Sequence, residues 1–243
     1  MDNTLYVGLS RQLTLQRALE VTANNLANLD TVGFKVEALT LNTDPLRPSN
    51  LTTGDPINYV IDNGVARNFG QGSIEQSSNP LDVAIEGDGF LTVQTPDGNR
   101  YTRDGRMALN AQNQLVDHAG NPVLSSSGSV ITLDPQKTDL AIAKDGTISQ
   151  NGLAVGKLGV SRFADLSVLK KQGSNLFDAP GVTPTQATNV HLSQGAVEHS
   201  NVQPVAEMTN LIAITRAYDQ VSQMVSQTQD LSDSAVQRLG KAA

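Results

Sequence analysis

The sequence contains no cysteine, which excludes disulfide bonds, thiolate catalysis and cysteine-based zinc sites. Tryptophan is also absent and aromatic residues make up 4% of the chain, so a site that stacks on sugar rings is disfavoured. Basic residues are in the minority, with 17 lysines and arginines against 24 aspartates and glutamates. The net charge of −7 argues against a protein that binds nucleic acid or anionic membranes by charge attraction.

Long apolar runs are missing as well. No stretch approaches the roughly 18 apolar residues of a membrane-spanning helix. Residues 1–10 also lack the basic segment and apolar run of a secretory signal. If the protein leaves the cytoplasm, we therefore expect it to do so without a cleaved signal peptide, although a cytosolic protein would have the same appearance.

Residue patterns typical of catalysis or metal binding are also lacking. The histidines, His118, His191 and His199, are scattered and have no suitably spaced carboxylate or histidine beside them. The Asp-Gly pairs at Asp97 and Asp104 do not have the spacing of a calcium loop and are explained better as turns. We therefore expect no enzyme activity, no cofactor, no metal site and no small-molecule substrate.

Two long helical patterns lie at opposite ends of the chain. At the front, apolar residues recur with a helical period and predict a helix over residues 3–28. At the back, residues 204–239 carry apolar positions at alternating steps of three and four, which is the spacing of a coiled-coil seam. We expect the buried seam of the two helices to comprise Leu15, Leu19, Leu26, Leu211, Ile214, Tyr218, Val221 and Val225.

The middle of the chain has a residue pattern typical of β-strands and turns. Residues 81–177 combine short apolar strands with Asp-Gly and Asn-Gly pairs, which supply the positive φ angles of tight hairpin turns. Residues 35–79 look irregular, with short extended pieces at 35–41, 58–61 and 64–69. The predicted fold class is α+β: long N- and C-terminal helices that form a coiled-coil layer, with a central antiparallel all-β domain.

Three regions follow from this prediction. The first is a discontinuous terminal-helix domain made of residues 1–34 with 200–243. An extended connecting region comprises residues 35–80 with 178–199, and the β domain is residues 81–177.

An asparagine-rich stretch ends the first helix. Asn24, Asn25 and Asn28 are locally costly there, because the asparagine side chain competes for backbone hydrogen bonds. One interpretation is a fraying helix end. The other is that Asn24 and Asn28 hydrogen-bond to a neighbour while Ala23 and Ala27 allow close approach, and the physics of the sequence leaves both open.

Three motifs, taken together, resemble a known family. They are Ala23–Asn28 followed by Thr31 and Gly33-Phe34-Lys35, then Asn79–Phe90 with Tyr101–Gly105, and finally Ser200-Asn201-Val202 with Glu207-Met208 and Arg216-Ala217-Tyr218. In this order and over nearly the whole chain, they are similar to the axial proteins of the bacterial flagellar rod and hook. Within that family the proximal rod subunits look most similar. Two residues depart from the family pattern: Leu91 stands where a second phenylalanine is common, and Thr215 stands where glutamine is usual.

The resemblance implies a structural axial component of the flagellar basal body, a proximal rod subunit that polymerises through its terminal helices and helps to transmit torque from motor to hook. It implies three partners: other proximal and distal rod proteins, copies of the chain itself, and the flagellar type III export apparatus. It also implies a place in the rod, which crosses the periplasm. The assembly motif would comprise Asn24, Asn25, Leu26, Asn28, Gly33 and Phe34.

Two alternatives stay open. One is a distal rod or hook subunit of the same family. The other, from a different class, is a surface adhesin or carbohydrate-binding module that presents a β domain on a helical stalk.

Overall fold

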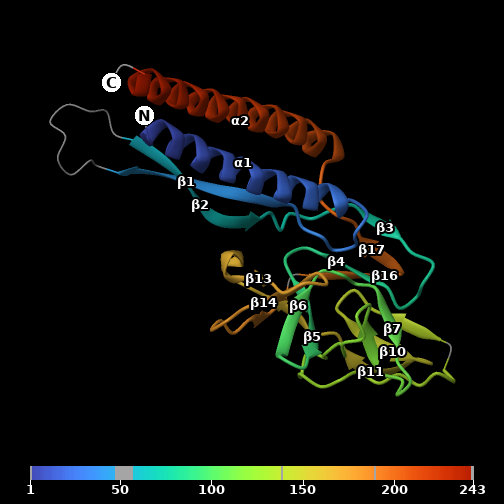
Figure 1. Cartoon of the computed structure of the whole chain (residues 1–243). Helices are drawn as coiled ribbons and strands as arrows, with labels where there is room; N and C mark the ends of the chain where they lie inside the picture. The colour runs from blue at the N-terminus through green and yellow to red at the C-terminus, as the bar shows by residue number, and fades with distance from the viewer. Residues whose placement is uncertain (1, 47–56, 138, 189, 242–243) are drawn as a thin grey trace. The chain divides into compact units, whose positions relative to one another are not determined.

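A computed structural model describes residues 2–46, 57–137, 139–188 and 190–241 (Figure 1). The chain divides into two compact units. The first unit comprises residues 1–27, 37–68 and 203–243, and the second comprises residues 28–36 and 69–202. Neither helix in the described residues has the length and apolarity needed to cross a membrane.

Two long helices belong to the first unit. Helix α1 spans Asp2–Ala27 and helix α2 spans Pro204–Lys241, so both predicted helices are present within two residues of their expected ends. They run antiparallel, because Gln12 Nε2 donates to the hydroxyl of Tyr218 at 3.1 Å while Gly8 lies opposite Val225. A Cβ atom at Gly8 would lie only 2.8 Å from Val225 Cγ2, so the two helices approach closely at that point.

A long hairpin completes the first unit. Strand β1, Glu37–Leu46, pairs antiparallel with β2, Ile57–Arg67, and both strands contact α1. The sequence pattern suggests two short pieces where the structure has the single strand β2. The two predicted pieces are joined at a β-bulge, where the register of the pairing with β1 shifts and Gly64 adopts a φ of +97°.

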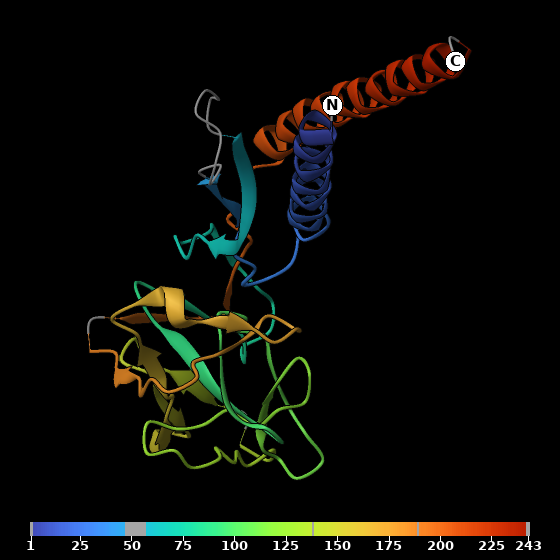
Figure 2. The same ribbon diagram turned by 60° about the vertical axis from the view of Figure 1, so that its left-hand side comes forward.

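The expected coiled-coil layer of the two terminal helices is wrong. In the described residues, α1 divides its buried surface between α2 and the β1–β2 hairpin, and Figure 2 shows the two helices at an angle to each other. The buried residues of α1 cover a wider arc than a coiled-coil seam; they include Thr14, Leu15, Val21, Thr22 and Asn25. Helix α1 is therefore shared between two partners, whereas a coiled-coil layer needs each helix to present one narrow stripe to the other.

The second unit is an antiparallel β domain. It includes the predicted range 81–177 together with residues 28–36, 69–80 and 178–202. All of its described strand pairs are antiparallel. Its strands are β3 Ile74–Gln76, β4 Val83–Glu86, β5 Phe90–Thr95, β6 Gly98–Thr102, β7 Met107–Leu109, β8 Leu115–Asp117, β9 Leu140–Ile142, β10 Thr147–Gln150, β11 Leu153–Lys157, β12 Val160–Arg162, β13 Lys170–Lys171, β14 Leu176–Asp178, β15 Thr185–Gln186, β16 His191–Gln194 and β17 Ala196–Glu198. A short 3₁₀ helix, η1, spans Leu166–Val168.

These strands form small sheets around two apolar clusters. The largest sheet has the order β13-β14-β6-β5-β12-β15, and a second has the order β11-β10-β9. One cluster is aliphatic and includes Val83, Leu115 and Ile148. The other is aromatic and is built around Phe90 and Phe177. Because β16 and β17 pair with β4 and β3, the last strands of the unit close against its first ones.

Candidate assembly site

Asn25, near the end of α1, is held by the backbone of β1. Its Oδ1 accepts a hydrogen bond from the Glu37 N–H at 2.9 Å, and its Nδ2 donates to the Glu37 carbonyl at 2.7 Å. The buried side-chain amide thus pairs with a residue of β1 as a neighbouring strand would. Nδ2 also lies 3.3 Å from Glu207 Oε2 on α2. Asn25 therefore joins all three parts of the first unit.

Asn24 takes part in the same network. Its Nδ2 donates to Glu37 Oε2 at 3.1 Å, and Arg67 from β2 binds the other oxygen of that carboxylate at 2.9 Å. In the second unit, Asn28 accepts a hydrogen bond from the Thr31 hydroxyl at 3.1 Å, in the turn that follows the helix. Asn25 is the most buried of the three asparagines, and the sequence interpretation gave a hydrogen-bonding role only to the other two. That Asn24 and Asn28 bind a neighbour stays a hypothesis.

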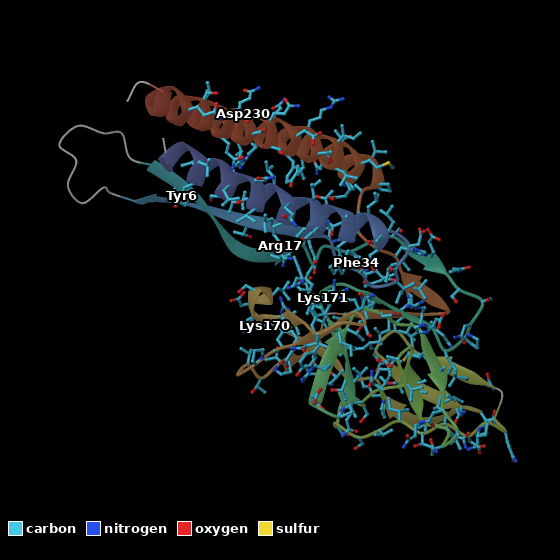
Figure 3. All side chains as sticks on the ribbon, viewed as in Figure 1. Tyr6, Arg17, Phe34, Lys170, Lys171 and Asp230 are labelled. Atoms are coloured by element: carbon cyan, nitrogen blue, oxygen red, sulfur yellow. The ribbon has the colours of Figure 1, made fainter. Side chains whose placement is uncertain are left out.

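The Gly33-Phe34-Lys35 segment is packed into the second unit. Gly33 adopts a φ of +71°, and its N–H donates to the Glu198 carbonyl at 2.8 Å. A Cβ atom here would lie 2.5 Å from Asp104 N, so the site admits only glycine. Phe34 is buried, and its ring centroid lies 4.7 Å from Lys171 Nζ (Figure 3).

Lys35, Arg103 and Glu198 form a buried ionic cluster in the second unit. Lys35 Nζ lies 2.6 Å from Glu198 Oε1, and Arg103 Nη1 lies 3.2 Å from Glu198 Oε2. Their side chains are 0%, 3% and 1% exposed, in the order Lys35, Arg103, Glu198. Lys35 also donates to the Gly70 carbonyl at 2.7 Å, and the Gly72 N–H donates to Glu198 at 2.9 Å.

One carboxylate therefore serves two buried cations. Burial lowers the pKa of Lys35 from its usual 10.5, and attraction to Glu198 opposes that shift. Burial lowers the pKa of Arg103 in the same way, again against the attraction of Glu198. Since a buried charge without a partner is strongly destabilising, Glu198 is the group on which the pairing of both cations depends. The sequence interpretation did not find this cluster, although Glu198 follows directly on the apolar pair Ala196-Val197.

Three flagellar families match separate parts of the chain. "Flagella basal body rod protein" matches residues 5–35, "Flagellar hook protein FlgE/F/G D1 domain" matches residues 84–150, and "Flagellar basal body rod FlgEFG protein C-terminal" matches residues 193–238. A "Flagellar basal-body rod protein FlgF" from Caulobacter vibrioides is 48% identical over 243 residues, which cover 99% of both chains. The chain belongs to the flagellar basal-body rod protein family. Within that family it is of the FlgF type.

More distant relatives carry related names. A "Flagellar basal-body rod protein FlgF" from Escherichia coli K12 is 32% identical and covers 98% of this chain and 99% of its own. A "Flagellar basal-body rod protein FlgG" from Bacillus subtilis 168 is 29% identical and covers 97% of this chain and 98% of its own. None of the matched family descriptions names a catalytic activity.

The buried cluster takes one residue from each matched family segment. Lys35 ends the first segment, Arg103 lies in the second and Glu198 lies in the third. The three parts of the sequence by which this rod protein resembles its family therefore meet at a single carboxylate.

The predicted helix seam of this rod protein lies in the first unit. Leu15 is buried, and the other seam positions are partly buried: Leu19, Leu26, Leu211, Ile214, Tyr218, Val221 and Val225. Other apolar residues of the same helices are exposed, among them Leu13 at 59% and Val205 at 76%. Tyr6, Ile212 and Leu231 are also exposed, so both helices keep apolar surface that the described residues leave uncovered.

Proposed function

We propose that this chain is a structural subunit of the proximal rod of the bacterial flagellum. The observation that carries the proposal is the 48% identity with a FlgF rod protein over 99% of both chains. At that coverage the likeness includes both helices, the hairpin and the β domain, and not one shared module. The role is mechanical, because a rod subunit acts through its contacts with other subunits.

The terminal helices would supply those contacts. Exposed side chains such as Leu13 on α1 and Val205 and Ile212 on α2 are apolar, and covering them with another subunit would remove apolar surface from water. The partners would be copies of this chain and other proximal and distal rod proteins. Many such contacts, shared along the rod, would help to transmit torque from the motor to the hook.

The same proposal places the chain in the rod where it crosses the periplasm. We infer that it reaches this place through the flagellar type III export apparatus. Support comes from membership of the family.

A pair of charge substitutions on α2 tests the proposal. Ile212→Asp puts a carboxylate on exposed apolar surface, and Gln220→Asp adds the same charge at an exposed polar position of the same helix. Each variant is expressed in bacteria that lack the native chain, and swimming and recovery with purified basal bodies are measured. We expect Ile212→Asp to lose both and Gln220→Asp to keep both.

Circular dichroism of the purified variants is the control for folding. Both should unfold at nearly the same temperature as the native chain, because both changes are at the surface. If folded Ile212→Asp protein supports swimming and is recovered with basal bodies like the control variant, assembly through this helix surface is contradicted.

A further inference from the structure

Arg103 is incompletely satisfied inside the second unit. Its Nη1 binds Glu198 and its Nη2 donates to the Gly87 carbonyl at 2.7 Å. Among the described residues, its Nε is the one buried side-chain nitrogen or oxygen with no hydrogen-bond partner. A buried N–H without an acceptor is costly, so Arg103 is held in this position at an energetic cost.

The buried cluster also carries an excess of charge. Lys35 and Arg103 are two cations and Glu198 is one anion, so one positive charge stays uncompensated within the cluster. The pKa of Arg103 is lowered, chiefly because burial disfavours its charged form. An added anion near Arg103 would offset this excess of positive charge.

A cavity of about 130 Å³ lies beside Arg103. One water needs roughly 10–15 Å³ of such space, so the cavity has room for a small organic group. Its apolar wall is made of phenyl rings: Phe90 has Phe69 at 5.5 Å and Phe163 at 5.9 Å between ring centroids. The Arg103 guanidinium carbon lies 5.1 Å from the Phe90 ring centroid.

A second arginine stands at the same cavity. Arg162 lies 3.9 Å from Asp88, and both residues line the cavity. Their side chains are 59% and 80% exposed, so this pair is loose and screened by water. With Lys35 and Glu198 included, the charged groups around the cavity sum to one positive charge.

We propose that this cavity is a carboxylate-binding site. A carboxylate matches the planar guanidinium of arginine, and a short aliphatic part would pack against the phenyl rings. The carboxylate would come either from a small free acid or from an aspartate or glutamate side chain of a second copy of this chain. The site goes beyond the structural role proposed above and does not depend on it.

Acetate is the probe, and the Arg103 Nε–Hε signal in the ¹⁵N spectrum of the full chain is the readout. Acetate should shift this signal in a saturable way, and sodium chloride at equal ionic strength should not. Arg162→Gln should weaken acetate binding about three-fold, because it removes the second cation at the cavity. Asp88→Asn should strengthen it about two-fold, because it removes a competing negative charge.

Lys157→Gln is the matched control. It removes an exposed positive charge from the same unit, but Lys157 pairs with Asp145 and does not line the cavity. Its affinity for acetate should be that of the native chain. If acetate gives no saturable shift, or if all three variants bind it alike, the proposal is overturned.

A dilution series distinguishes the two sources of the carboxylate. If the Arg103 signal shifts with protein concentration alone and acetate reverses that shift, the occupant is an acidic side chain of a second copy. If the signal is independent of protein concentration while acetate still binds, the site takes a free carboxylate. The motility of cells that make Arg162→Gln protein is measured in a separate experiment. A negative result in the acetate experiment therefore does not contradict the proposed structural role.

Discussion

Lys35 and Glu198, 163 residues apart in the sequence, form an ion pair of 2.6 Å in the interior of the second unit. Lys35 precedes the β1–β2 hairpin, and Glu198 ends β17 shortly before α2 begins. The pair therefore joins residues 28–36 of the second unit to the last strand of that unit. Arg103 shares the same carboxylate, so the loss of Glu198 affects more than one interaction.

Glu198→Gln should be the most damaging change in this cluster. It leaves Lys35 and Arg103 as two buried cations without a counter-ion, and we expect a loss of about 3–5 kcal/mol in the free energy of unfolding. Lys35→Met should cost less, because Arg103 and Glu198 remain as a balanced pair. Urea unfolding of the two variants measures the difference.

The double variant gives the sharper test of this asymmetry. Adding Lys35→Met to Glu198→Gln should recover part of the lost stability, because one of the two unpaired cations is removed. If the double variant is less stable than Glu198→Gln alone, the excess of positive charge is not what destabilises the Glu198→Gln variant.

The pH dependence of stability should carry a contribution from Lys35. Because its pKa in the folded state is lower than 10.5, the unfolded chain binds more protons than the folded chain in the window just below pH 10.5. The free energy of unfolding of the native chain should therefore rise with pH in that window, relative to Lys35→Met. Tyr101, whose pKa is raised mainly by burial, acts in the opposite direction above pH 10 but is present in both proteins. Parallel pH profiles of the two proteins would contradict the prediction.

Gly33 and Gly120 form a matched pair for backbone strain. Both have positive φ angles, +71° and +88°, but a Cβ atom would clash with the backbone of Asp104 only at Gly33. Gly120→Ala should cost about 1–2 kcal/mol from the φ angle alone. Gly33→Ala should cost at least about 1 kcal/mol more, because backbone atoms must move to admit the methyl group. Thermal unfolding checks this order, and equal costs would mean that the close approach is unimportant.

Asn25→Ala should destabilise the first unit. It removes both hydrogen bonds to the Glu37 backbone and leaves buried groups unsatisfied, at a cost of about 2 kcal/mol or more. Gln16→Ala, an exposed polar change on the same helix, should stay within about 0.5 kcal/mol of the native chain. Far-UV circular dichroism during urea unfolding reports the loss of helix. A cost at Asn25 no larger than at Gln16 would show that the asparagine is not holding β1.

Local features of the fold were predictable from sequence because local chemistry sets them. Helices α1 and α2 follow from apolar periodicity, and the Asn151-Gly152 pair forms the turn between β10 and β11 with φ angles of +50° and +77°. The coiled-coil layer was predicted wrongly, because the heptad spacing of α2 does not tell how much of α1 another element covers. Nothing near Leu15 in the sequence indicates that the hairpin shares the surface of α1.

The buried cluster could not be predicted from the sequence, because it also depends on contacts between distant segments. Lys35, Arg103 and Glu198 each look like an ordinary surface charge within their own segment. Their pairing depends on β17 returning to pair with β3, a contact between residues more than a hundred positions apart. Asn25 was visible as an unusual helix residue, but its acceptor on β1 was not.

The most direct test of the account is quantitative mass spectrometry of basal bodies purified from the bacteria that make this chain. The chain should be recovered in a fixed proportion to the other rod proteins wherever the rod is present. The chain should be missing from the basal bodies of cells whose assembly stops before the rod. Absence of the chain from intact rods would contradict the account.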